Sequence, residues 1–146
     1  MTGEARFDLG HSRLHQLIGD LADVPDAALM PTLAALQREL TEHFAQEDAE
    51  LIRLGKTENA CHLDEHAAVL KSTCEVIAAL ALGNTAVVRR FAQAMGDWLP
   101  EHVQEMDLRL ARQLFRHRTG GAPIQLTRRA APRFTTHNLH SESVPC

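Results

Sequence analysis

The sequence predicts an all-α protein: an antiparallel four-helix bundle that runs up-down-up-down and is followed by an irregular C-terminal tail. Apolar residues recur at helical spacing over four stretches, and the links between these stretches are short. Ala and Leu are abundant, whereas aromatic residues make up only 4% of the chain, and this balance favours helices over sheets. A length of 146 residues suits one domain with a single core.

The first helix is predicted over residues 7–22, with Asp8 as its N-cap. The second is predicted from residue 25 or 26 to about residue 54, where Gly55 would close it. Because Pro31 lies near its start, we expect the first turn to be irregular or the helix to begin later.

The third helix is predicted over residues 59–82 and the fourth over residues 85–115. After the fourth helix, the run TGGAP breaks the helical pattern. We therefore predict a bundle domain over residues 1–116 and a tail over residues 117–146, which is either mobile or packed on the bundle.

Charge and composition argue against several classes of partner. The net charge is −4 with neutral histidines, so neither nucleic acid nor an anionic membrane surface is an expected partner. The chain has no apolar run of the roughly 18 residues that a membrane span needs. The N-terminus lacks the apolar segment of a secretory signal, and the three cysteines are an odd set without CxxC spacing. Both observations favour the reducing cytoplasm.

Two pairs of potential metal ligands lie close together in the sequence. His43 and Glu47 are four residues apart, and so are His62 and His66. Residues four apart lie on the same face of an α-helix, where they can bind one metal ion together. A turn over residues 55–59 would reverse the chain between the pairs. Two antiparallel helices would then direct both pairs into the same interior space.

Every predicted helix carries at least one candidate ligand, since the chain contains nine histidines. The first helix contributes His11, with His15 one turn later, and the fourth contributes His102 with either Glu105 or Asp107. Taken singly, an inward histidine is most often a packed core residue, and an HxxxE pair is often an exposed helix pair. Candidate ligands on all four helices together favour a metal site, because burying so many polar groups without partners would be costly. Nitrogen and oxygen ligands without thiolate suit two iron or manganese ions better than structural zinc.

Four motifs resemble those of the bacterial hemerythrins, and together they cover roughly residues 7–115. FDLGHSRLHQLIGDL is similar to the opening Asp-x-x-His segment of that family, and HFAQEDAEL is similar to its His-Phe-x-x-Glu motif. HLDEH resembles its His-x-x-x-His motif, and WLPEHVQEMD resembles its Trp-Leu-x-x-His-x-x-x-x-Asp motif.

The resemblance implies a non-haem centre of two iron ions, joined by an oxo or hydroxo group. The implied ligands are His62, His66 and His102 for one iron, His11 and His43 for the other, and Glu47 and Asp107 as bridges. The iron with fewer ligands would keep an open position for O2 or a small anion. The family pattern favours Asp107, although a five-residue step from His102 turns roughly 140° around an α-helix. Glu105 is better placed in a regular helix, and a π-type widening near Pro100 or His102 would bring Asp107 round.

The resemblance implies reversible O2 binding for storage, delivery or sensing. Two alternatives remain open at this point: a di-iron redox enzyme that reacts with O2 or peroxide, and a redox-responsive signalling module whose tail docks elsewhere. His15 stands where the family usually has an apolar residue. It would either line the oxygen pocket as a proton donor or reach solvent. The sequence leaves the oligomeric state open, a monomer included.

Overall fold

The computed structural model describes residues 1–121, and within this range the chain forms helices and no strand. The elements are α1 (Ala5–Asp23), a 3-10 turn η1 (Asp26–Ala28), α2 (Leu29–Gly55), α3 (Ala60–Ala81), α4 (Thr85–His102), a π-helical segment η2 (Val103–Asp107) and α5 (Leu108–Arg118). The predicted tail, apart from the residues up to 121, lies outside the described range.

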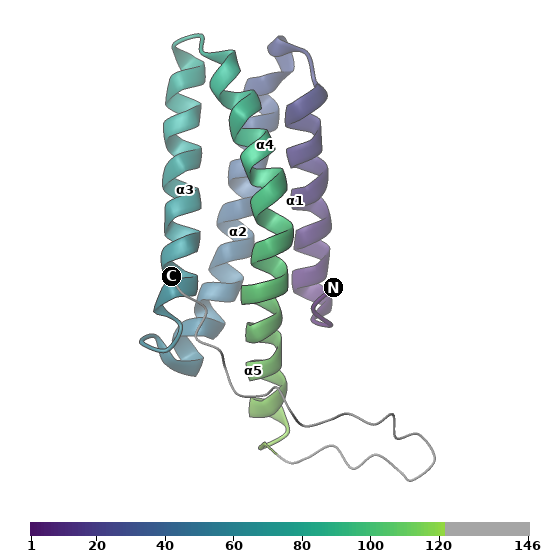
Figure 1. Cartoon of the computed structure of the whole chain (residues 1–146), viewed down its shortest axis with the longest axis vertical. Helices are drawn as coiled ribbons and strands as arrows, with labels where there is room; N and C mark the ends of the chain where they lie inside the picture. The colour runs from purple at the N-terminus through teal and green to yellow at the C-terminus, as the bar shows by residue number, and fades with distance from the viewer. Residues whose placement is uncertain (122–146) are drawn as a thin grey trace, which may run out of the picture.

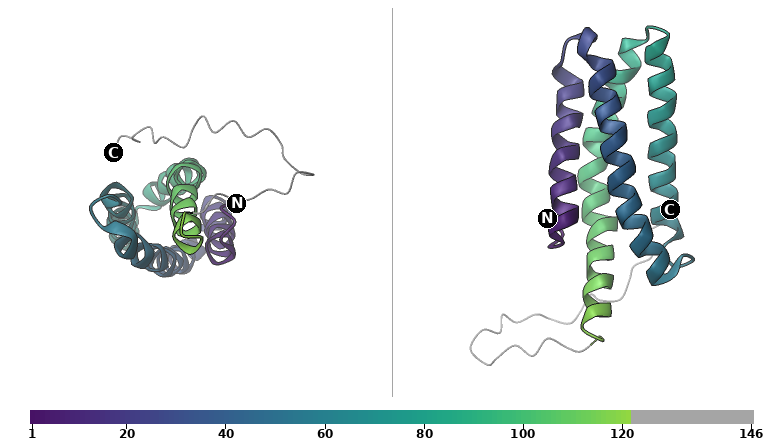
Figure 2. Two further views of the ribbon diagram at one scale, coloured as in Figure 1. Left: turned by 90° about the horizontal axis from the view of Figure 1, so that it is seen from below. Right: turned by 180° about the vertical axis from the view of Figure 1, so that it is seen from behind.

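The helices form the predicted up-down-up-down bundle (Figure 1). Helices α1 and α3 run in one direction and α2 and α4 in the other, and α1 packs against α2 and α4, as α3 does. Short links therefore join antiparallel neighbours. Helix α5 continues the line of α4 through η2 and passes beyond the ends of the other helices (Figures 1 and 2).

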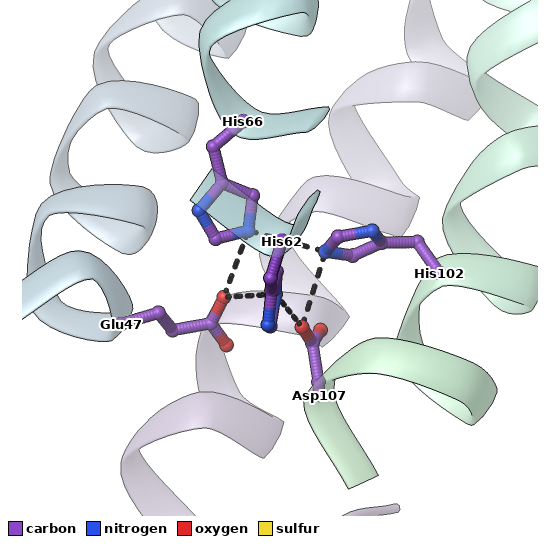
Figure 3. A group of neighbouring side chains, drawn as sticks. All are labelled: Glu47, His62, His66, His102 and Asp107. Carbon is purple, nitrogen blue, oxygen red and sulfur yellow. Dashed lines mark hydrogen bonds and ion pairs between the residues drawn. The ribbon is translucent and has the colours of Figure 1, made fainter. Parts of the chain in front are cut away.

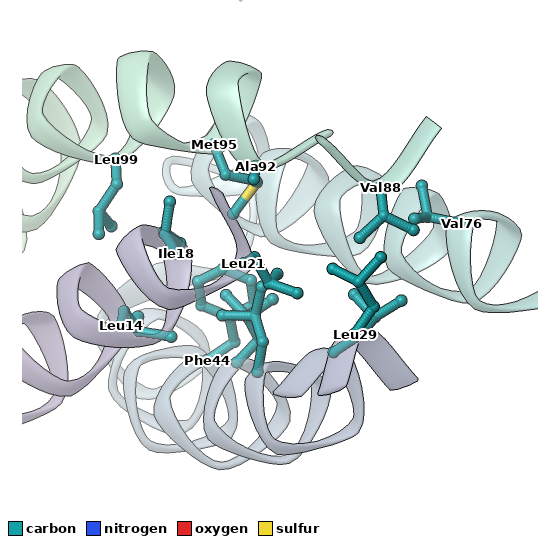
Figure 4. Packing of buried hydrophobic residues seen from close by; sticks show 13 residues of the cluster. Leu14, Ile18, Leu21, Leu29, Phe44, Val76, Val88, Ala92, Met95 and Leu99 are labelled. Atoms are coloured by element: carbon teal, nitrogen blue, oxygen red, sulfur yellow. The ribbon is translucent and has the colours of Figure 1, made fainter. Parts of the chain in front are cut away.

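Two apolar clusters occupy the interior at different heights. The larger cluster includes Leu14, Leu40 and Leu99 and fills the bundle toward the α1–α2 and α3–α4 links (Figure 4). The smaller cluster consists of Phe7, Leu51, Leu110 and Leu114, with Leu54 and Leu63 packed against it. Along α1, α2 and the last helices, the predicted ligands lie between the members of these clusters. The bundle thus encloses a polar layer between two apolar layers.

The first two helices differ from the predictions in detail. Helix α1 begins at Ala5, so the prediction of Asp8 as its N-cap is wrong. The Asp8 carboxylate instead accepts hydrogen bonds from the backbone N–H groups of Thr2 and Gly3, at 2.7 and 3.1 Å. The irregular start of the second helix is confirmed, because η1 precedes α2 and Pro31 lies in the first turn of α2.

The π-helical segment decides which carboxylate faces the interior. In η2 the Leu108 N–H bonds to the Val103 carbonyl five residues earlier, which widens the helix by one residue. Asp107 is consequently fully buried on the same side as His102, whereas Glu105 is exposed. The predicted widening is confirmed.

Candidate metal centre

Seven buried side chains converge in the polar layer, and they come from all four bundle helices and from η2. They are His11, His43, Glu47, His62, His66, His102 and Asp107. None of them is more than 6% exposed. These are the seven residues that the sequence analysis singled out, and the fold brings all of them together. The other candidate on the fourth helix, Glu105, lies outside the cluster.

Five of these side chains form what we call the three-histidine group: Glu47, His62, His66, His102 and Asp107 (Figure 3). One nitrogen or oxygen atom from each lies within 4.8 Å of the others. The Nε2 atom of His66 is 3.3 Å from Glu47 Oε2, and the Nε2 atoms of His62 and His102 are 3.0 and 3.1 Å from Asp107 Oδ1. The three imidazoles therefore direct the same ring atom toward one small volume.

The remaining histidines share the two carboxylates in a second cluster, which we call the two-histidine group: His11, His43, Glu47 and Asp107. His43 Nε2 is 3.2 Å from Glu47 Oε1, and His11 Nε2 is 2.8 Å from Asp107 Oδ2. Each carboxylate thus directs one oxygen toward each group. This is the arrangement by which a carboxylate bridges two metal ions.

Local helix geometry explains how each group forms. The four-residue spacing of His43 and Glu47, and of His62 and His66, stacks each pair on one face of α2 or α3. The widening in η2 turns Asp107 toward the same centre. The antiparallel packing of α1 against α2 and α4 supplies His11 from the opposite side.

Several ligand atoms have no hydrogen-bond partner although they are buried. Among the described residues, the atoms of this kind include Nε2 of His43 and His62, both carboxylate oxygens of Glu47, and Oδ1 of Asp107. A buried polar atom left unpaired costs on the order of 1–3 kcal/mol. In addition, Nε2 of His66 and Nε2 of His102 lie only 3.1 Å apart. Cations between these atoms would satisfy all of them, so the cluster fits a metal centre with nitrogen and oxygen ligands.

Carboxylates outside the cluster orient two of the imidazoles. Asp48 Oδ1 lies 2.6 Å from Nδ1 of His66, and Glu65 Oε2 lies 2.7 Å from Nδ1 of His102. Each carboxylate accepts a hydrogen bond from Nδ1–H, so Nε2 is directed inward, where it can bind a metal ion. The Phe44 ring also fixes the orientation of His66, because the two rings are stacked with their centroids 3.9 Å apart. The sequence analysis noted Glu65 in the motif but missed Asp48, whose only local signal is its place directly after Glu47.

Glu65 should therefore support metal binding without touching the metal. We expect Glu65→Ala to weaken metal binding by about 10- to 100-fold, the usual effect of losing such a partner. The matched control is Asp64→Ala, because Asp64 is the adjacent carboxylate and is exposed. Calorimetric titration with Mn²⁺ measures both affinities. Equal affinities for the two variants would refute an orienting role for Glu65.

The buried carboxylates are held in their charged form. Burial raises the pKa of Asp107, but the close imidazoles of His102, His11 and His62 outweigh burial and lower the pKa far below its ordinary value. Burial likewise opposes ionisation of Glu47, and the close imidazoles of His43 and His66 lower its pKa. For His66, burial alone would lower the pKa, but the carboxylates of Asp48 and Glu47 raise it to about 9. Without metal, an imidazolium at His66 therefore compensates part of the negative charge of these carboxylates.

In the metal-free protein, stability should fall as pH rises above neutrality. The pKa of His66 is about 9 in the folded chain and near 6.5 in an unfolded one. Its contribution is fully present below about pH 6.5 and is lost as pH rises through about 9. Urea unfolding of metal-free protein across this range measures the effect. Asp48→Asn removes a charged partner and should make the decline shallower; a slope unchanged from wild type would contradict this origin.

The position of His15 differs from that of the seven clustered residues. Its side chain is exposed, and it lines a surface pocket of about 430 Å³ whose wall also includes His11, Asp8 and Gln104. The pocket lies along α1 and η2, on the side of the two-histidine group.

The comparison with known proteins agrees with this geometry. A family described as the hemerythrin HHE cation binding domain matches residues 2–114. The chain belongs to the hemerythrin family. As a member of that family, it is similar to a bacteriohemerythrin of Ralstonia nicotianae (strain ATCC BAA-1114 / GMI1000), with 31% identity over 105 residues that cover 72% of this chain and 77% of that protein. No solved structure matches the chain significantly.

Proposed function

We propose that this hemerythrin-family chain binds two iron ions and takes up O2 reversibly, for storage, delivery or sensing. The observation that carries the proposal is the sharing of Glu47 and Asp107, each of which directs one oxygen toward each histidine group. A single ion would not require both oxygens of both carboxylates. The family supplies the expectation that the ions are iron.

The two groups offer different numbers of ligand atoms. The three-histidine group offers three nitrogens and two oxygens, whereas the two-histidine group offers two nitrogens and two oxygens. An ion held by the two-histidine group would therefore have one protein ligand fewer than its neighbour and would keep a position open. O2 or a small anion would bind at that position. When bound, the iron pair would supply the electrons that O2 needs to bind reversibly.

The protein residues would control access and polarity around the ions. The apolar clusters above and below the polar layer exclude bulk water from most of the site. The Trp98 ring is stacked on the His102 ring, with 4.3 Å between the ring centroids, and covers one face of that imidazole. A surface pocket reaches His11 of the two-histidine group, and a smaller pocket of about 200 Å³ reaches His62 of the three-histidine group. The larger pocket supports an approach of small molecules from the α1–η2 side, where the ion with fewer ligands would keep its open position.

Anaerobic loading with Fe²⁺, followed by exposure to O2, tests the proposal. We expect two irons per chain and a long-lived visible charge-transfer band that disappears when O2 is removed. Rapid decay of the band with release of peroxide would instead support a redox enzyme. A chain that binds one iron or none would overturn the proposal.

One residue of the larger pocket, His15, favours the alternative of a redox enzyme. His15 is the imidazole on the pocket wall that does not belong to the cluster, and it can donate a proton to a reduced oxygen species that leaves through the pocket. We expect His15→Ala to slow autoxidation several-fold without changing the iron content. The decay rate of the charge-transfer band measures this. Gln16→Ala, an exposed neighbour on the same helix, serves as the control. An unchanged decay rate in His15→Ala would remove this role.

The cellular setting is part of the same proposal. No helix among the described residues is long and apolar enough to cross a membrane. The net charge of −4 supports a protein without nucleic-acid or membrane partners. We propose a cytoplasmic location on the basis of the sequence. The signalling alternative depends on the tail, which lies outside the described residues.

A further inference from the structure

Helix α1 contains a buried glycine beside the metal centre. Gly10 lies within the helix, next to His11, and is buried. Glycine in a helix interior is destabilising relative to alanine, because it loses more backbone freedom on folding. A glycine inside a helix at a buried position therefore calls for a contact that excludes a larger residue.

The contact is with the imidazole of His43 on the neighbouring helix. A Cβ atom at position 10 would lie 2.3 Å from Nδ1 of His43, 3.0 Å from its Cε1 and 3.2 Å from its Cγ. The first distance is far below any ordinary van der Waals contact, so even a methyl group would force the ring to move. The edge of the His43 ring thus rests on the backbone of α1.

His43 has little room to move away. Its side chain is 2% exposed, and its ring meets the Phe7 ring edge-on at 6.3 Å and the His11 ring at 4.8 Å between centroids. Its Nε2 atom is directed at Glu47 Oε1, 3.2 Å away. A displacement of the ring would therefore carry Nε2 away from the position that a ligand must hold.

We propose that Gly10 is a positioning residue for the two-histidine group: its lack of a side chain allows His43 to pack against α1 and to direct Nε2 at the second metal ion. This inference rests on the proposed di-iron function. Gly10 contributes no ligand atom itself. The histidines of the three-histidine group come from α3 and α4, and the three atoms nearest to a Cβ at position 10 all belong to His43. The loss of space at position 10 should affect one ion and spare the other.

The same helix provides a matched control. Gly19 also lies inside α1, is exposed, and would have no atom within 4 Å of an added Cβ. Gly19→Ala should therefore raise the thermal unfolding midpoint, because it removes only the backbone freedom of glycine. Gly10→Ala introduces the same atom and removes the same freedom. A difference in sign between the two variants isolates the contact with His43.

The experiment compares wild type, Gly10→Ala and Gly19→Ala. After anaerobic loading with Fe²⁺, wild type and Gly19→Ala should each bind two ions per chain, and Gly10→Ala should bind one. For the metal-free proteins, Gly10→Ala should lower the unfolding midpoint and Gly19→Ala should raise it. A Gly10→Ala protein that binds two ions with the affinity of wild type would overturn the inference. A wild type that binds no pair of ions would overturn the proposed function, whereas the metal-free midpoints would still test the contact.

A double-variant cycle covers the case in which Gly10→Ala folds poorly. In the background His43→Ala the ring is absent, so Gly10→Ala should no longer lower the midpoint and should raise it as Gly19→Ala does. Recovery of stability in the double variant supports the positioning role. A drop of the same size with and without the His43 ring would assign the effect to another part of α1 and refute the proposal.

Discussion

Removing the metal ions from the loaded protein should lower its midpoint of thermal unfolding by on the order of 10 °C. Free metal at 100 to 1,000 times its dissociation constant stabilises the folded state by about 3–4 kcal/mol. For a chain of this size each kcal/mol shifts the midpoint by roughly 2–4 °C. The physical origin is the set of buried ligand atoms that have no partner without the ions, including both oxygens of Glu47.

Calorimetric melts of loaded and chelator-stripped protein, both recorded without oxygen, measure this shift. The control is Asp107→Asn, which removes the negative charge of the proposed bridge, so the unfolding midpoint of this variant should respond far less to metal. Identical midpoints for loaded and stripped wild type would mean that the cluster is stable without ions. The proposed centre would then lose its energetic basis.

Asp107→Asn should weaken metal binding by more than about 100-fold, beyond the 10- to 100-fold loss typical of outer hydrogen-bond partners. Asp107 is fully buried, and its oxygens lie within 3.1 Å of Nε2 atoms from both histidine groups. The amide keeps the volume of the side chain but removes the negative charge and one acceptor oxygen. Both ions of the proposed centre would lose a ligand at once, because Asp107 belongs to both histidine groups.

The matched control is Glu105→Gln, the same chemical change two residues earlier. Glu105 lies in the same π-helical segment, but its side chain is exposed. We expect the affinity and the stoichiometry of Glu105→Gln to equal those of wild type. Titration with Mn²⁺, followed by metal analysis, gives both quantities. Strong binding in Asp107→Asn together with weak binding in Glu105→Gln would reverse the assignment of the bridge.

The sequence by itself determined the fold class and the set of residues that meet in the centre. Apolar residues at helical spacing predict each helix and its buried face, because the period of a helix is a local property of the chain. The same period places His43 with Glu47 and His62 with His66. The family resemblance then selected Asp107, although the spacing in a regular helix favoured Glu105.

Only the tertiary structure decided the contacts between helices. The rotation and shift of each helix against its neighbour decide which oxygen of Glu47 faces which group. They also place Asp48 beside His66, and Gly10 beside the ring of His43. Local spacing identifies the face of a helix but not the residue that the face meets. The error at Asp8 has a related cause, because its carboxylate binds backbone N–H groups that precede the helix rather than those of the first helical turn. The position of Asp107 needed both: the motif in the sequence named it, and the extra residue of the π-helical segment turned it inward.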